Sequence, residues 1–109
     1  MPQQPEQQVA RGEALDRAVN EAIERGRWPG EDDARTAYRC ECGRPGCNEL
    51  AELTPRDYED VRSHARWFIV VPGHERPEIE VIVRATPHYV VVEKRDDAGR
   101  VAEATDPRE

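Results

Sequence analysis

Cys40-Glu-Cys-Gly-Arg-Pro-Gly-Cys47 is the segment that decides the fold, because it holds all three cysteines of the chain within eight residues. Thiolate sulfur is a preferred ligand of zinc, which proteins bind in a tetrahedral shell. Cys40 and Cys42 would face the same side of an extended segment. The glycines and the proline between Cys42 and Cys47 supply turns that bring the third sulfur back toward the first two. The segment therefore predicts one metal site, with zinc as the cofactor.

Three thiolates leave one ligand to be found among His64, His74 and His88. His74 is the preferred candidate, because the Pro72-Gly73 turn before it fixes its direction and Glu75 or another nearby carboxylate can orient its ring. His64 comes second, since it lies at the end of a predicted helix, where a protonated histidine also suits the helix dipole. His88 follows a proline beside a predicted strand. The predicted metal ligands are Cys40, Cys42, Cys47 and His74.

Other chemistries could use the same residues. Cys42 and Cys47 could form a redox pair, or the cluster could act as a thiol-based redox or zinc sensor. A small metalloenzyme would keep an open zinc position, with Glu41 or Glu75 as its base. No phosphate loop and no Ser/His/Asp signature accompanies the cysteines. We therefore expect a structural metal rather than an enzyme.

An iron–sulfur cluster is a further alternative. Three cysteines and one histidine that begin with Cys-x-Cys also hold the two-iron, two-sulfur centre of the CDGSH proteins. The Cys-Asp-Gly-Ser-His run that defines those proteins is absent, and the four residues between Cys42 and Cys47 make too short a gap for it. Zinc is the better prediction.

The charge distribution argues against a nucleic-acid partner. The net charge of −7 divides into −4 for residues 1–34, zero for 35–95 and −3 for 96–109. Nucleic-acid binding usually needs a basic surface, which this chain would have to gather locally from its 15 arginines. No apolar run approaches the length of a membrane span, and the N-terminus lacks the pattern of a signal peptide. The expected location is the cytoplasm, where three cysteines remain reduced.

The N-terminal region, 1–34, is predicted to be an arm with a Pro/Gln-rich, disordered start over residues 1–8. A helix is predicted over 9–27, ended by Trp28-Pro-Gly30 and followed by an acidic linker. Leu15, Val19 and Ile23 fall at i, i+4 and i+8 and form a narrow apolar stripe. We expect the helix to dock through this stripe on its own domain. The alternative is another protein, or a second copy of the chain.

Residues 35–95 are predicted to form the metal-binding domain, and the fold class is α+β with short antiparallel strands. Strands are expected at 36–40, 67–71 and 89–93, with a possible return strand at 48–53. A helix should begin at Thr54-Pro55 and run to about His64. Residues 77–84 fit a helix or a strand, and we prefer the helix. Residues 96–99 are predicted to form a turn, and 96–109 an acidic segment whose last ten residues are a mobile tail.

Several short motifs together resemble a group of short, Cys-rich actinobacterial proteins of unknown function. They are Tyr38-Arg-Cys-Glu-Cys42 with Cys47, Val71-Pro-Gly-His-Glu75, Val90-Val-Val-Glu-Lys94 and Thr105-Asp-Pro-Arg108. The resemblance covers about residues 9–108. It implies no activity, and it adds support to His74 as the partner of the three cysteines. The similar proteins often carry an acid near the turn where this chain has Arg44-Pro-Gly46.

Overall fold

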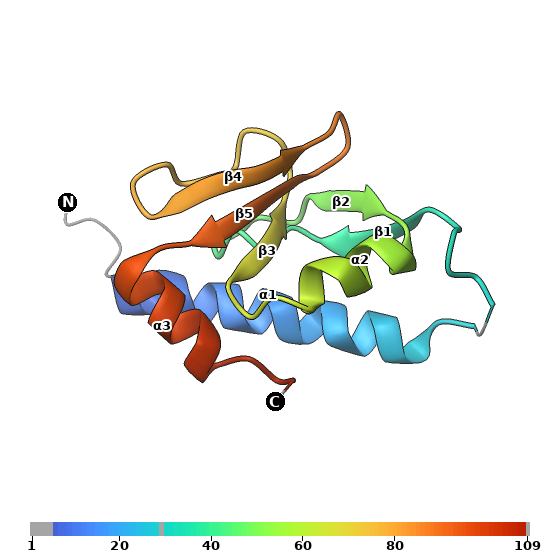
Figure 1. Cartoon of the computed structure of the whole chain (residues 1–109), viewed down its shortest axis with the longest axis horizontal. Coiled ribbons are helices and arrows are strands. Elements are labelled where there is room, and N and C mark those ends of the chain that lie inside the picture. The colour runs from blue at the N-terminus through green and yellow to red at the C-terminus, as the bar shows by residue number, and fades with distance from the viewer. Residues whose placement is uncertain (1–5, 29, 109) are drawn as a thin grey trace.

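The computed structural model describes residues 6–28 and 30–108, and over these it has the α+β fold that the sequence predicts. The elements in chain order are α1 (Glu6–Gly26), β1 (Thr36–Arg39), β2 (Leu50–Leu53), α2 (Pro55–Arg62), β3 (Trp67–Val70), β4 (Glu80–Ala85), β5 (Val90–Lys94) and α3 (Asp96–Ala104). Strands β1 and β2 form an antiparallel hairpin, and a second sheet has the order β3-β5-β4. In Figure 1 the hairpin and the sheet lie above the long helix α1, and α3 packs beside α1.

The core is organised around β5, whose alternate side chains enter two clusters. Val91 packs with Tyr38, Tyr58 and other residues of the hairpin and of α2. Val90 and Val92 face the second cluster, which contains Cys40 and Cys42 as well as residues of β3 and α3. A strand covered on both faces reads as a continuous apolar run, which explains why three valines occur in succession here. The cysteine segment is thus part of the core.

Helix α2 begins as its sequence predicts. The Thr54 hydroxyl accepts a hydrogen bond from the Asp57 amide at 3.1 Å, and Pro55 occupies the first helical turn. The return strand of the hairpin, which was only a possibility from the sequence, is also present as β2. These elements form where local capping and turn chemistry agree with the apolar pattern.

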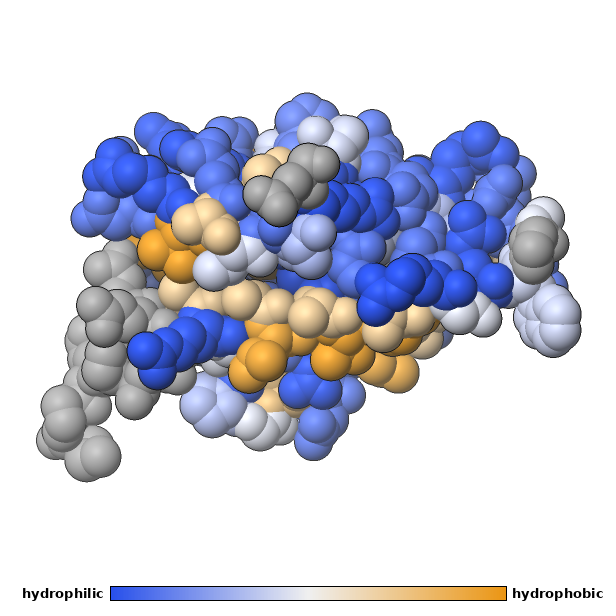
Figure 2. All heavy atoms as spheres, turned by 90° about the horizontal axis from the view of Figure 1, so that it is seen from below, coloured by the Kyte–Doolittle hydropathy of each residue, from blue (hydrophilic) through white to orange (hydrophobic). Residues whose placement is uncertain are grey.

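The predicted docking face of the N-terminal helix is wrong. The Leu15 side chain is 69% exposed and Val19 is 44% exposed, and of the stripe only Ile23 packs against the core. Figure 2 shows apolar residues in a band along this outer face. The inner face is mostly polar instead, with five buried polar residues: Glu13, Asp16, Arg17, Asn20 and Glu21. A polar face can be buried in this way when its groups are hydrogen-bonded or paired.

The polar face of α1 satisfies backbone groups of other segments. Asn20 donates from Nδ2 to the Arg39 carbonyl at 2.8 Å and accepts from the Arg39 amide at 2.6 Å. Arg17 donates to the carbonyls of Ala65 (2.8 Å) and Ala102 (2.7 Å). Its guanidinium also lies over the Phe68 ring, 4.4 Å from the centroid. The helix is therefore held by directed bonds as well as by apolar contact.

Three further predictions on secondary structure are corrected. Residues 80–85 form strand β4, so the helix preferred for 77–84 is wrong; pairing with β5 decides between two periodicities that the sequence leaves equal. Residues 96–104 form α3, which replaces the predicted turn and the first part of the tail. The disordered start was expected over 1–8, but residues 6–8 belong to α1. Residues 1–5, Pro29 and Glu109 lie outside the described residues.

Candidate metal centre

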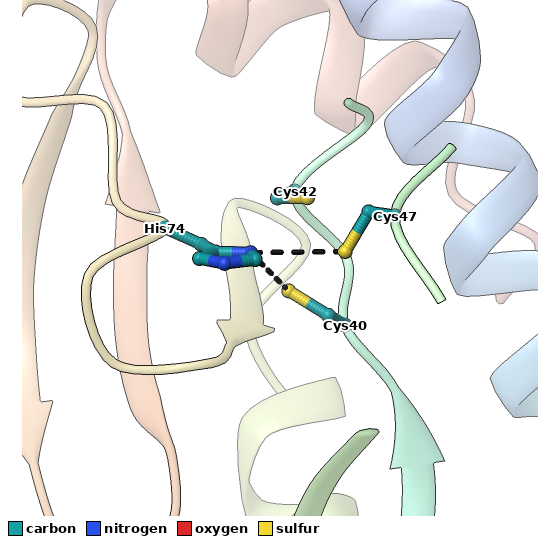
Figure 3. Close-up of side chains that lie close together, drawn as sticks. All are labelled: Cys40, Cys42, Cys47 and His74. Carbon is teal, nitrogen blue, oxygen red and sulfur yellow. Dashed lines mark hydrogen bonds between the residues drawn. The ribbon is translucent and has the colours of Figure 1, made fainter. Parts of the chain in front are cut away.

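The structure brings together the four residues that the sequence proposed as ligands. Cys40 and Cys42 follow β1, Cys47 precedes β2, and His74 lies in the turn after β3 (Figure 3). One donor atom from each of the four lies within 4.8 Å of the donors of the others, so the group could hold a metal ion. Cys40 and Cys42 are buried, while Cys47 and His74 are half-buried. The four residues come from segments that the fold, and not the chain order alone, places together.

Two sulfur–nitrogen distances match the edges of a tetrahedral zinc shell. The Nδ1 atom of His74 lies 3.5 Å from Cys40 Sγ and 3.7 Å from Cys47 Sγ. A zinc ion about 2.3 Å from sulfur and about 2.0 Å from nitrogen requires sulfur–nitrogen edges of about 3.5 Å. Three soft sulfurs and one imidazole also suit zinc better than they suit magnesium or calcium, which prefer oxygen ligands. The residues present therefore fit a closed, four-ligand zinc site.

Glycines shape the loop between the sulfurs, which we call the cysteine loop (residues 40–47). Gly43 and Gly46 have φ angles of 71° and 79°, in the left-handed region that favours glycine. Gly43 also lies against α1: a Cβ atom built there would be 2.7 Å from the Val9 carbonyl oxygen. Gly12 of α1 meets the loop equally closely, because its Cβ would be 2.7 Å from the Gly43 oxygen. Helix α1 thus packs directly against the cysteine loop.

Backbone amides point at two of the sulfurs. The Val71 amide donates to Cys40 Sγ at 3.2 Å, and the Arg44 amide to Cys42 Sγ at 3.5 Å. Amide donors of this kind stabilise thiolates. The hydrogen bond with Cys40 is the main cause that lowers the pKa of Cys42 to about 4. The same interaction, together with burial, raises the pKa of Cys40. A cation at the cluster would favour the thiolate form of all three sulfurs.

The imidazole is oriented by a carboxylate that the sequence analysis did not name. Glu49 Oε2 lies 3.0 Å from His74 Nε2, on the side of the ring away from the sulfurs. The Cys40 amide donates to the Glu49 carbonyl at 3.1 Å, so the hairpin places Glu49 opposite Cys40. Glu75, the carboxylate named first for this role, instead accepts from the Gly73 amide at 2.9 Å. A carboxylate behind a ligating histidine fixes its tautomer and increases its basicity.

Three polar side chains tie the cysteine loop to the rest of the fold. Asp16 accepts from the Gly43 amide at 3.0 Å. Glu41, which is wholly buried, accepts from the Ile69 amide at 2.9 Å and from Asn20 at 2.8 Å. Burial raises the pKa of Glu41 to about 7 against these two bonds, which lower it. Sequence analysis missed Asp16 and Asn20, although their spacing along the polar face of α1 is helical.

The other candidates lie elsewhere. His64 stacks on Trp67 with ring centroids 3.6 Å apart, and His88 is exposed between β4 and β5. Glu41 and Glu75, considered as bases of a metalloenzyme, are both bound by backbone amides. The four donors at the cluster also match the number of positions in a tetrahedral shell. The cluster could therefore hold a metal ion with protein donors alone.

Compared with protein-family models, with curated proteins and with solved structures, the chain matches none of them. Within residues 6–28 and 30–108, no helix has the length and apolar character needed to cross a bilayer.

Proposed function

We propose that this chain is a small zinc-binding protein in which the metal is structural, and that it serves as a protein-interaction or regulatory module. The observation that carries the proposal is the convergence of three sulfurs and one imidazole nitrogen within 4.8 Å. With four protein donors, the shell has no position left for a substrate or a reactive water. A cytoplasmic location is part of the proposal, because three free thiols suit a reducing compartment.

A structural ion at this place would join three parts of the fold. Cys40 and Cys42 belong to the core cluster around β5, Cys47 leads into the hairpin strand β2, and His74 lies in the turn after β3. Coordination would close the cysteine loop and fix this turn against it. Because binding free energy then becomes folding free energy, removal of the ion should destabilise the whole domain.

The test is a thermal melt of the purified chain with and without a zinc chelator, together with zinc retention in two histidine variants. We expect chelation to lower the melting temperature, and His74→Ala to lose zinc. His64→Ala is the matched control and should retain zinc, because His64 is exposed and stacks on Trp67 instead. A melting temperature indifferent to chelation would contradict a structural role. Zinc loss from His64→Ala alone would contradict the ligand assignment.

A second candidate, a thiol-based redox or zinc sensor, is favoured by the closeness of the sulfurs and the partial exposure of Cys47. Hydrogen peroxide would take two electrons and two protons from a pair of these thiols, which leaves one disulfide and two waters and removes two metal ligands. Thiol titration and zinc release after peroxide treatment test this candidate. Reversible release with retained folding would support it, and release only on unfolding would contradict it.

A further inference from the structure

The outer face of α1 is apolar and uncovered over much of its length. Leu15, Ala18, Val19 and Ala22 are exposed, and α3 continues the surface through the half-buried Val101. Between the two helices lies a hollow of about 650 Å³. Its lining consists of Ala10, Arg11, Ala14, Leu15, Val101 and Thr105. Figure 2 looks onto this side of the molecule and shows the apolar band along it. A concave apolar surface of this kind marks an interaction site.

A second hollow, of about 320 Å³, adjoins the first at the cysteine loop. Arg11 and Leu15 line both hollows, so the two form one continuous surface, which we call the α1 groove. The second hollow is ringed by Arg11, Arg39 and Arg44. Its one carboxylate, Asp16, is engaged by Arg39 Nε at 2.5 Å and by the loop backbone. In a chain with a net charge of −7, this end of the groove is locally basic.

We propose that the α1 groove binds an acidic amphipathic helix of another protein. A helix of the partner, lying between α1 and α3, would bury its apolar stripe against Leu15 and Val101, as helices do in grooves. Its carboxylates would meet the arginines at the cysteine loop, where Arg and carboxylate form charge-assisted, often bidentate bonds. A second copy of this chain fits less well, because in a symmetric dimer the groove would meet another groove, where the charged residues are arginines and Asp16 is already paired with Arg39.

This inference rests on the proposed function, since the cysteine loop forms one wall of the groove. Arg44 lies between the ligands Cys42 and Cys47, and the Arg44 carbonyl accepts from the Cys47 amide at 3.1 Å. An ion at the cluster would hold this wall, and Arg44 with it, in one conformation. Zinc loading and helix binding should therefore be coupled, with tighter binding by the zinc-loaded chain.

The test uses a displayed library of helical peptides with leucine or isoleucine at i, i+3, i+4 and i+7, and with Glu, Gln or Lys at the flanking positions. The zinc-loaded full chain should enrich peptides that carry Glu. Leu15→Gln should lower the affinity for an enriched peptide by about tenfold or more, and so should the double variant Arg11→Gln with Arg44→Gln. Arg25→Gln is the matched control, because Arg25 is an exposed arginine of α1 outside both hollows. It should leave the affinity unchanged.

Several results would overturn the proposal: enrichment of no peptide, enrichment of Lys-containing peptides, or equal loss of affinity in the Arg25 control. A chain that sediments as a dimer, and that becomes a monomer in Leu15→Gln, would show that a second copy occupies the groove. Zinc content and a melting curve are measured on every variant. Absence of peptide binding by a chain that holds zinc refutes only the groove, whereas a chain without zinc refutes the metal proposal.

Discussion

Replacing Glu49 by Gln should weaken zinc binding by about tenfold without unfolding the chain. The Glu49 carboxylate lies 3.0 Å from His74 Nε2, and the variant keeps the shape of the side chain but removes its charge. Loss of a carboxylate behind a ligating histidine typically costs 10–100-fold in affinity, or about 1.4–2.7 kcal/mol. The Glu49 side chain is 60% exposed, so solvent screens the interaction and the lower end of this range applies.

The assay is a competition titration of the apo chain against a chromophoric zinc chelator at neutral pH. Glu52→Gln is the control, because Glu52 is an exposed glutamate in the neighbouring strand β2. We expect wild type and the control to bind zinc alike, with the Glu49 variant weaker. Equal affinity in all three proteins would refute the orienting role of Glu49. Weakening in Glu52→Gln as well would mean that net charge, and not the contact with His74, sets the affinity.

Four further outcomes follow from the contacts of α1 and of the cysteine loop packed against it. Asn20→Ala should lower the free energy of unfolding by about 2–4 kcal/mol in urea melts, because the half-buried amide and carbonyl of Arg39 and the buried Glu41 carboxylate lose their partner. Val19→Ala, at a position 44% exposed, should change it by less than about 0.5 kcal/mol, and equal effects would contradict the polar docking of α1. Gly43→Ala should cost more stability than Gly46→Ala, since both glycines have positive φ but only a Cβ at Gly43 would meet α1, at 2.7 Å; a larger loss at Gly46 would contradict the packing. Burial raises the pKa of Glu13 from 4.5 to about 7, so the folded chain holds this proton more tightly, and its stability falls by up to about 3 kcal/mol as pH rises from about 4.5 to about 7. Glu13→Gln should flatten that decline between pH 5 and pH 7 in the zinc-saturated chain, and an unchanged pH slope would show that Glu13 is not its source.

The metal ligands could be predicted because their signals are local. Residue type and spacing are enough to predict them: three cysteines lie around glycine turns, and a histidine follows a Pro-Gly turn. The orienting carboxylate could not be assigned in the same way. Its place depends on the hairpin register, which puts Glu49 opposite Cys40, and residues 48–53 have no clean period in the sequence.

The face of the N-terminal helix that docks could not be read from its apolar stripe. Its buried groups bind backbone atoms distant in the chain: the partners of Asn20 and Arg17 lie 19 to 85 residues away. Which backbone groups need a partner is known only once the hairpin and the sheet have formed. The apolar face of α1 is exposed and forms part of the α1 groove.

Helix α3 was mistaken for a turn because Asp96-Asp-Ala-Gly99 has turn composition. The same acids suit the first turn of a helix. Gly99 lies within the helix, where a Cβ would come within 2.5 Å of the Arg66 guanidinium, the movable end of a flexible side chain. Composition alone does not separate these two uses of glycine and aspartate.

The central claim, one structural zinc held by three cysteines and His74, is tested most directly by X-ray absorption of the purified chain at the zinc edge. The account predicts one zinc per chain, with three sulfurs at about 2.3 Å and one nitrogen at about 2.0 Å. Absence of zinc, a shell of oxygen and nitrogen atoms, or an iron edge with iron–iron scattering would contradict it.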